Sequence, residues 1–260
     1  MLGTQERVAN DKDDEYLKLV YDLYNTSLKA IEYIYKETYK GIDIKCKIFS
    51  DNIVLAIEKK EDDGELYTSY KKGIIADFAT FFQSFALQKG ILTRGSITIG
   101  KLYIDDIFIH GEALVRAYQL ESHVANYPRI IYDSEIAMSF IQENDRKEKT
   151  NRDTDGIFYI DVFKSMSYSQ KLDGAMENIK KSLLDIWCKI LYKIPYKEIN
   201  SVIGKPKQYK TNYKHLQKIN WLITIFNNYC ENSNQTDLKI SIPDDKMLIL
   251  CKEGNCCYDK

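Results

Sequence analysis

The sequence predicts an α+β fold with a mixed sheet, followed by a C-terminal helical extension. Two β-prone runs separated by a short polar turn, within residues 43–57, predict a β-hairpin. Apolar residues at helical spacing predict a helix before the hairpin, at 13–37, and another after it, at 68–88. The later part of the chain changes to two long helical patterns. We therefore divide the chain into residues 1–165 and residues 166–260.

The bulk composition indicates a folded protein of the cytoplasm. The chain has 260 residues with 44% hydrophobic and 29% charged side chains, which is enough to bury a sizeable core. Its formal net charge of −1 argues against nucleic acid as a partner. No apolar run reaches the roughly 18 residues of a membrane span, and no basic-then-apolar signal opens the chain. For this reason we expect no membrane partner. Six cysteines without an export signal indicate a reducing compartment.

The elements of the first part follow from hydrophobic periodicity. Residues 43–49 alternate between polar and apolar, which is typical of a half-buried strand. Residues 53–57 are almost wholly apolar, which predicts a return strand in the centre of a sheet. Asp133 or Ser134 is expected to cap a helix that follows a short strand. The other predicted elements are a strand at 92–100, a strand or strand-like loop at 102–109, a helix from about Gly111, strands at 129–132 and 155–163, a charged loop at 143–153, helices at 168–192 and 205–230, and a β-like end at 237–251.

Three segments carry candidate chemistry. The hairpin turn holds Asp51 in the sequence FSDNIV, and an acid at a turn is by itself an ordinary turn former. The segment RGSITIG opens with Arg94, and HGEALVRAYQLE contains Gly111 at the expected start of a helix. The combination of the three segments is more specific than any one of them.

Together these segments resemble the class III nucleotide cyclases, and more closely the pyrimidine cyclases of the bacterial Pycsar anti-phage systems. The resemblance covers residues 41–163. It implies a ferredoxin-like mixed sheet and an enzyme, a phosphorus–oxygen lyase, that converts UTP or CTP to pyrophosphate and cyclic UMP or cyclic CMP. It also implies a homodimer with active sites at the interface, and a separate effector protein that senses the cyclic nucleotide in antiviral defence.

The resemblance also assigns roles to residues. Asp51 matches a ligand of two divalent ions, Mn²⁺ or Mg²⁺, which prefer hard oxygen donors. Arg94 matches a phosphate-binding arginine, and the alternative is a surface arginine at a strand start. Lys47 matches a base-reading lysine, and the alternative is a solvated strand lysine. Phe108 and Gly111 are implied to face the base in the partner's site. The backbone of Leu2, Gly3 and Thr4 is implied to cradle phosphates, against the alternative of a terminus without structure.

Two departures from the family pattern shape the expectation. Where purine cyclases place an Asn and an Arg on the helix after Gly111, this chain has Val115 and Gln119, and Phe108 replaces a base-reading Asp. These differences favour a pyrimidine substrate without choosing between UTP and CTP. The second metal-binding Asp and its strand would precede Met1, so we expect the chain as given to lack the first strand and to turn over little substrate. The alternative function is a catalytically inactive regulatory or scaffolding subunit with the cyclase fold.

Overall fold

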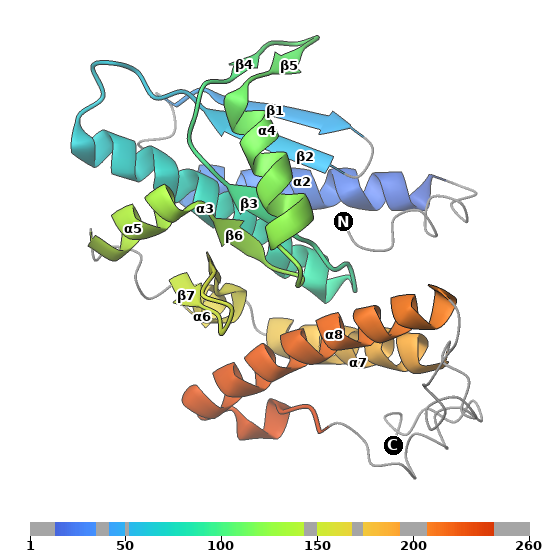
Figure 1. Cartoon of the computed structure of the whole chain (residues 1–260). Helices are drawn as coiled ribbons and strands as arrows, with labels where there is room; N and C mark the ends of the chain where they lie inside the picture. Colours follow the sequence, from blue (N-terminus) through green and yellow to red (C-terminus); the bar gives the residue numbers. More distant parts are fainter. Residues whose placement is uncertain are drawn as a thin grey trace. The chain divides into compact units, whose positions relative to one another are not determined.

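The structure is a computed structural model that describes the following residues: 14–34, 42–49, 52–142, 150–167, 174–192 and 207–241. The chain divides into two compact units (Figure 1). Unit 1 comprises Met1–Ala86 and Ile91–Ser169, and unit 2 comprises Leu87–Gly90 and Gln170–Lys260. The described elements of unit 1 include both helices and strands, whereas those of unit 2 are helical. The predicted α+β class is confirmed, and the cyclase-like character of the first part stays a prediction.

The first half of unit 1 is a hairpin packed against two helices. Strand β1 (Ile44–Phe49) pairs antiparallel with β2 (Asn52–Ile57), with Ile44 opposite Ile57 and Phe49 opposite Asn52. Helix α2 (Glu15–Ile34) buries one face through Val20, Leu23 and Ile31, at the three- and four-residue spacing of a helix stripe. Both predicted strands of this hairpin are confirmed to within one residue at each end.

Helix α3 (Glu65–Gln88) connects two hydrophobic cores within unit 1. One side of the helix carries Ile74, Phe78 and Phe82, which pack with α2 and with apolar residues of the hairpin. Another side carries Ala76, which packs among residues of a second sheet. A helix that is apolar on more than one side must be covered on each of them. Helix α3 therefore packs against both the β1–β2 hairpin and the second sheet.

The second sheet of unit 1 has four strands in the order β3 (Gly95–Ile97), β6 (Ile130–Tyr132), β8 (Phe158–Ile160) and β7 (Thr150–Arg152). Strands β3 and β6 are parallel, and the other pairs are antiparallel, so the sheet is mixed as predicted. Helix α5 (Ser134–Gln142) covers it with Ile136, Ala137 and Phe140, all at most 1% exposed. Helix α6 (Val162–Ser167) follows β8.

Several boundaries differ from the sequence prediction. The strand expected at 92–100 is limited to Gly95–Ile97, and the strand expected at 155–163 is limited to Phe158–Ile160. The loop expected at 143–153 contains β7, because its polar residues Asn151 and Arg152 pair with β8 as an edge strand. In the expected β-like end at 237–251, the described part begins with a 3₁₀ turn at Thr236–Leu238, and residues 242–251 lie outside the described residues.

The prediction that the return strand is central in a sheet is wrong for the described part of the chain. There, β2 pairs with β1 alone, and β3 ends the other sheet. Residues Ile53–Ile57 are half-buried rather than fully buried. An apolar run records the residues' preference for burial, but it does not supply the neighbouring strand that would bury them.

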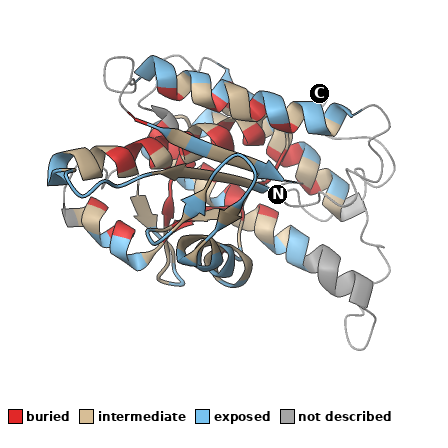
Figure 2. Cartoon of the chain, turned by 90° about the horizontal axis from the view of Figure 1, so that it is seen from above, coloured by how far each residue is buried: buried red, intermediate tan, exposed pale blue. Residues whose placement is uncertain are grey.

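Unit 2 is built on two paired helices, α7 (Ala175–Tyr192) and α8 (Lys207–Asn232). Their described buried residues recur at helical spacing. Figure 2 colours the helices of the chain by burial and shows buried and exposed positions alternating along them. The indole N–H of Trp187 donates to Asn220 Oδ1 at 3.0 Å, and the Asn227 side chain exchanges two hydrogen bonds with the backbone of Ile240. Among the described helices, none has the length and hydropathy needed to cross a membrane.

Candidate functional site

A two-stranded ribbon forms where the sequence predicted one strand or a loop at 102–109. Strand β4 (Tyr103–Ile104) pairs antiparallel with β5 (Ile109–His110). The turn between them is organised by Asp105, whose Oδ1 accepts from the backbone N–H of Ile107 at 2.8 Å and of Phe108 at 2.7 Å. This Asx-type turn reverses the chain within what reads as a single β-prone run.

The carboxylate of Asp105 also determines the electrostatics of the ribbon. The hydroxyl of Tyr103 donates to Asp105 Oδ2 at 2.8 Å. This hydrogen bond is the main cause that lowers the pKa of Asp105, followed by the two backbone N–H groups and, more weakly, by the charge of Lys47. The same bond raises the pKa of Tyr103. Asp105 is therefore an ionised, fully oriented acid at neutral pH.

Strand β1 and the ribbon approach each other through their lysines. Lys45 Nζ donates to the carbonyl oxygen of Ile104 at 3.4 Å. Lys47 lies two residues further along β1, on the same face, and its charge acts on Asp105. The structure therefore brings the predicted base-reading Lys47 to the ribbon that carries Phe108. Sequence reasoning did not single out Asp105, because its role depends on the hydrogen bonds of the turn.

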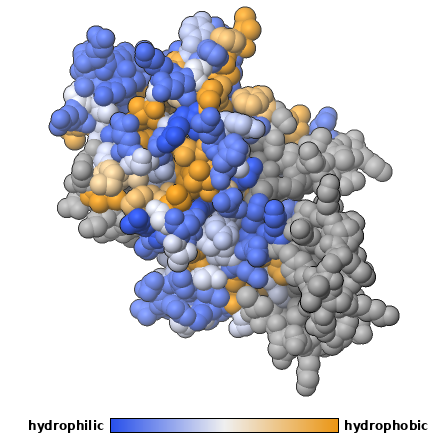
Figure 3. All heavy atoms as spheres, in the orientation of Figure 1, coloured by the Kyte–Doolittle hydropathy of each residue, from blue (hydrophilic) through white to orange (hydrophobic). Residues whose placement is uncertain are grey.

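Phe108 stands in a short aromatic row that is open to solvent. Its ring is stacked with the ring of His110, with centroids 5.9 Å apart and 18° between the planes, and it is tilted against Tyr103 at 6.0 Å. Phe108 is 52% exposed and the neighbouring Ile107 is 95% exposed. Figure 3 shows this hydrophobic tip at the top of the molecule. An exposed aromatic face of this kind can stack on a nucleobase or pack against another protein surface.

Gly111 joins the ribbon to helix α4 (Glu112–Gln119) and is required by close backbone approach. Its φ of 151° and ψ of 171° fall in a region that only glycine adopts readily. A Cβ atom at this position would lie 2.4 Å from the carbonyl oxygen of Lys101 and 2.9 Å from Cα of Leu102. The N–H of Ala113 donates to the same Lys101 oxygen at 3.1 Å. The glycine thus fixes α4 against the segment that enters the ribbon.

Arg94 lies at the other end of α4. Its Nε is ion-paired with Glu121, which sits in the π-helical turn Leu120–Val124 after α4. Both side chains are about one quarter exposed. Ten residues of helix separate Gly111 from Glu121, which at 1.5 Å per residue places them about 15 Å apart. Within one chain, Arg94 and the ribbon residues therefore do not form one site.

A second arginine, Arg116 on α4, is paired with the acidic residue Asp133. Arg116 donates to Asp133 through Nε and Nη2, each at 3.0 Å, and Thr98 Oγ1 donates to Asp133 Oδ2 at 2.9 Å. The hydrogen bond from Arg116 is the main cause that lowers the pKa of Asp133. Asp133 Oδ1 also accepts from the N–H of Ser134 at 2.8 Å. The predicted cap of α5 is thus Asp133, and it links α4, β3 and α5 in one polar cluster.

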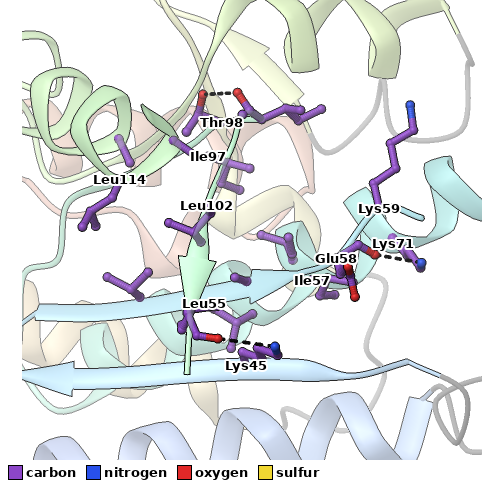
Figure 4. Close-up of a pocket in the computed structure, with 18 of the residues that line it drawn as sticks. Lys45, Leu55, Ile57, Glu58, Lys59, Lys71, Ile97, Thr98, Leu102 and Leu114 are labelled. Atoms are coloured by element: carbon purple, nitrogen blue, oxygen red, sulfur yellow. Dashed lines mark hydrogen bonds between the residues drawn. The ribbon is translucent and has the colours of Figure 1, made fainter. Parts of the chain in front are cut away.

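A cavity of about 610 Å³ lies between the β1–β2 hairpin and the four-stranded sheet of unit 1 (Figure 4). Strand β2 and the β3 segment form two of its walls, and α3, α4 and the segment that enters the ribbon contribute others through residues such as Ile75, Leu114 and Ile104. None of the predicted site residues in the described part, Arg94, Lys47, Phe108 and Gly111, lines it. This cavity is therefore separate from the described residues that the cyclase resemblance singles out.

Four predicted site residues lie outside the described residues: Leu2, Gly3, Thr4 and Asp51. The described strands that flank Asp51 in sequence end at Phe49 and begin at Asn52, which are paired. Within the described ranges, no group of three or more His, Cys, Asp or Glu side chains is arranged to hold a metal ion. The predicted metal ligand is consequently neither supported nor excluded by this geometry.

Comparison of the chain with family models, with curated proteins and with solved structures finds no match.

Proposed function

We propose that this protein is a pyrimidine nucleotide cyclase, which converts UTP or CTP to a 3′,5′-cyclic nucleotide and pyrophosphate as an anti-phage signal. The observation that supports the proposal best is the approach of the β1–β2 hairpin to the β4–β5 ribbon. The contact of Lys45 with Ile104 and the effect of Lys47 on Asp105 place two sequence-predicted regions side by side. These are the strand that carries the predicted base-reading Lys47 and the ribbon that carries Phe108 and leads into Gly111, so both would face the base of one site.

In this proposal, different residues of the chain contact the base and the phosphates. Phe108 offers an exposed ring face on which a pyrimidine can stack. Lys47 offers a hydrogen-bond donor for a base carbonyl, since its ammonium group carries only donors. Arg94 would leave its ion pair with Glu121 and bind the pyrophosphate oxygens. A guanidinium group suits this role because it can donate two parallel hydrogen bonds to a phosphate.

Asp51 would bind divalent cations, Mn²⁺ or Mg²⁺, through hard carboxylate oxygens. When bound, two such ions supply activation of the ribose 3′-hydroxyl and neutralise the triphosphate charge. Asp105 would keep the ribbon on the base side of the site oriented through the hydrogen bonds of its turn.

The separation of Arg94 from the ribbon favours a composite site in a homodimer. One chain cannot bring Gly111 and the Arg94–Glu121 pair together across a helix of about 15 Å. The surface that would meet a second copy is apolar and exposed, and its residues lie on and beside the ribbon and α4: Ile99, Tyr103, Ile107, Phe108, Val115 and Tyr118. Exposed apolar patches of this kind mark contact surfaces. The cyclic product would then act through a separate effector protein.

The alternative function is a non-catalytic subunit with the same fold. It is favoured by the ion pair that already occupies Arg94. A subunit of this kind would bind a nucleoside triphosphate weakly or not at all, and would release no pyrophosphate. The apolar surface on the ribbon and α4 would then serve assembly alone.

The test is incubation of the protein with each of the four ribonucleoside triphosphates and Mn²⁺, with products identified by mass spectrometry. We expect a cyclic pyrimidine nucleotide and pyrophosphate, and we expect Asp51→Ala to abolish both. Asp62→Ala is the control, because Asp62 is an exposed acid in a polar turn that carries no predicted role. Equal turnover by Asp51→Ala and the parent protein would refute the metal assignment. Absence of cyclic product from all four substrates would favour the non-catalytic alternative.

A further inference from the structure

The carboxyl end of helix α4 holds an acid in an electrostatically unfavourable place. The helix continues from Gln119 directly into the π-helical turn Leu120–Val124, and Glu121 is the acidic residue of that turn. The carbonyl end of a helix carries partial negative charge, so an acid is disfavoured there and a basic residue is favoured. Arg94 supplies the positive charge, because its Nε is ion-paired with the Glu121 carboxylate. Glu121 therefore depends on Arg94 at this end of the helix.

The π-helical turn that carries Glu121 is held by specific hydrogen bonds. The N–H of Ala125 donates to Leu120 O at 2.9 Å, which is the five-residue spacing of a π-turn. Ser122 Oγ donates to Tyr118 O at 2.6 Å, so a side chain also bonds the helix carbonyls at this point. Turns of this kind are rare and occur frequently at functional sites. The backbone that presents Glu121 to Arg94 is thus defined by the fold.

Arg94 is positioned by the start of strand β3. The next residue, Gly95, donates its N–H to Arg129 O at 3.3 Å and pairs with Ile130 in the parallel β3–β6 ladder. Among the described residues, Glu121 is the one ion-pair partner of Arg94. Both side chains are about one quarter exposed, so water and dissolved anions can reach the pair. The guanidinium is therefore accessible to an anionic ligand, but a carboxylate of the same chain already binds it.

A carboxylate and a phosphate bind an arginine through the same donors. Each accepts charge-assisted hydrogen bonds from the guanidinium N–H groups, so arginine recognises both. Pyrophosphate therefore has to displace the carboxylate of Glu121 before it can bind the Nε edge of Arg94. The negative charge of Glu121 also repels a phosphate placed beside the arginine. Charges a few ångströms apart near a protein surface interact strongly enough to change an affinity by about tenfold.

We propose that Glu121 is a built-in competitor for the phosphate group that Arg94 binds, and that it keeps this arginine closed until a triphosphate or pyrophosphate displaces it. The inference rests on the proposed function, which gives Arg94 its phosphate. It adds a positioning residue that sets the affinity for the phosphate chain by acting through Arg94. The return of Glu121 to Arg94 after the reaction favours release of pyrophosphate.

The test is the affinity of the full chain for inorganic pyrophosphate, measured by isothermal titration calorimetry. Divalent ions are left out, so that binding does not depend on the proposed metal site. Glu121→Gln keeps the size of the side chain and removes its charge, so Kd should fall by about tenfold. Glu112→Gln is the matched control, because Glu112 is an exposed acid at the other end of α4 and its substitution changes the net charge equally. We expect that variant to keep the Kd of the parent protein.

A double-mutant cycle tests whether Glu121 acts through Arg94. When Arg94→Met is already present, Glu121→Gln should no longer change Kd, and far-UV circular dichroism checks that each variant folds. The proposal is overturned if Glu121→Gln binds pyrophosphate no more tightly than the parent protein, or if Glu112→Gln has the same effect. Weaker binding by Glu121→Gln would also overturn it, because Glu121 would then orient Arg94 rather than compete. Absence of binding in every variant overturns it as well.

The cyclase assay separates this inference from the proposed function. With triphosphate and Mn²⁺, Glu121→Gln should lower KM by about tenfold without raising kcat, since the change acts on phosphate binding. Cyclic product from both proteins together with equal pyrophosphate affinity would reject the competitor and keep the cyclase. Tighter pyrophosphate binding by Glu121→Gln without cyclic product from either protein would reject the cyclase and keep Glu121 as a competitor at a polyphosphate site.

Discussion

Replacing Gly111 by alanine tests whether the ribbon is held to α4 by backbone contact. An added Cβ would lie 2.4 Å from Lys101 O, well inside the 3.0 Å below which Cβ contacts essentially never occur. The backbone conformation at φ 151° adds strain of about 1–3 kcal/mol for a residue with a side chain. Forcing the two backbones apart costs about 1–3 kcal/mol more, as for other overpacked sites. The free energy of unfolding should therefore fall by roughly 2–6 kcal/mol.

Thermal unfolding followed by far-UV circular dichroism measures this loss. For a chain of this size, each kcal/mol corresponds to about 2–4 °C, so Tm should drop on the order of 10 °C. Gly95→Ala is the matched control in the same unit. A Cβ at Gly95 would meet the Ile130 side chain at 3.6 Å, an ordinary contact. We expect that variant to keep its Tm or gain slightly, because alanine restricts the unfolded chain.

The Tm values of the two glycine variants test whether the close approach of Gly111 to Lys101 matters for stability. If Gly111→Ala and Gly95→Ala have the same Tm, the close approach between Gly111 and Lys101 does not hold the ribbon and the reasoning fails. If Gly111→Ala is destabilised as expected, hydrogen exchange should locate the loss at the ribbon and at the N–H of Ala113, which donates to Lys101.

Two further predictions concern buried and partly buried ion pairs. Arg129 is 1% exposed and is ion-paired with both Asp153 and Asp155. Arg129→Met should lower the free energy of unfolding in urea by about 3–5 kcal/mol, because two acids lose their cation. An unchanged urea midpoint would contradict this. Asp133 has a lowered pKa, mainly through Arg116, so its ionised form stabilises the fold above the ordinary pKa of about 3.9, and this stabilisation is lost as pH falls through the folded pKa. The Tm difference between Asp133→Asn and the parent protein should therefore be largest near pH 7 and shrink toward pH 3; a difference that stays constant across this range would rule out the assignment.

Local sequence was sufficient for the hairpin and for the α+β class. The β-prone runs at 43–49 and 53–57 specify strands because their side chains fit an extended, half-buried backbone, and the short polar turn between them fixes their pairing. The same holds for α3, where seven apolar residues at helical spacing identify a buried helix. The two strands, their turn and helix α3 depend on residues that are close in sequence, so hydrophobic periodicity is sufficient to predict them.

Chain reversal at Asp105 and edge pairing at β7 depend on specific hydrogen bonds, which the composition of a run does not record. Residues 102–109 have the composition of one strand, yet the carboxylate of Asp105 turns the chain into a ribbon by accepting two backbone N–H groups. Residues 150–152 are polar and read as a loop, yet they form β7 because β8 offers an open edge. In both cases a few specific hydrogen bonds outweigh the average preference of the residues.

The sequence alone determined which residue types are available for a site, and the tertiary structure decided which partners they have. Lys47 was expected to read the base and Phe108 to face the base in the partner's site, and the fold brings the strands of these two residues together within one chain. Arg94 was expected to meet phosphate, but the fold gives it Glu121 as a partner at the far end of α4. The reason is that a charge pairs with whatever lies within a few ångströms, and that distance is set by how distant segments pack.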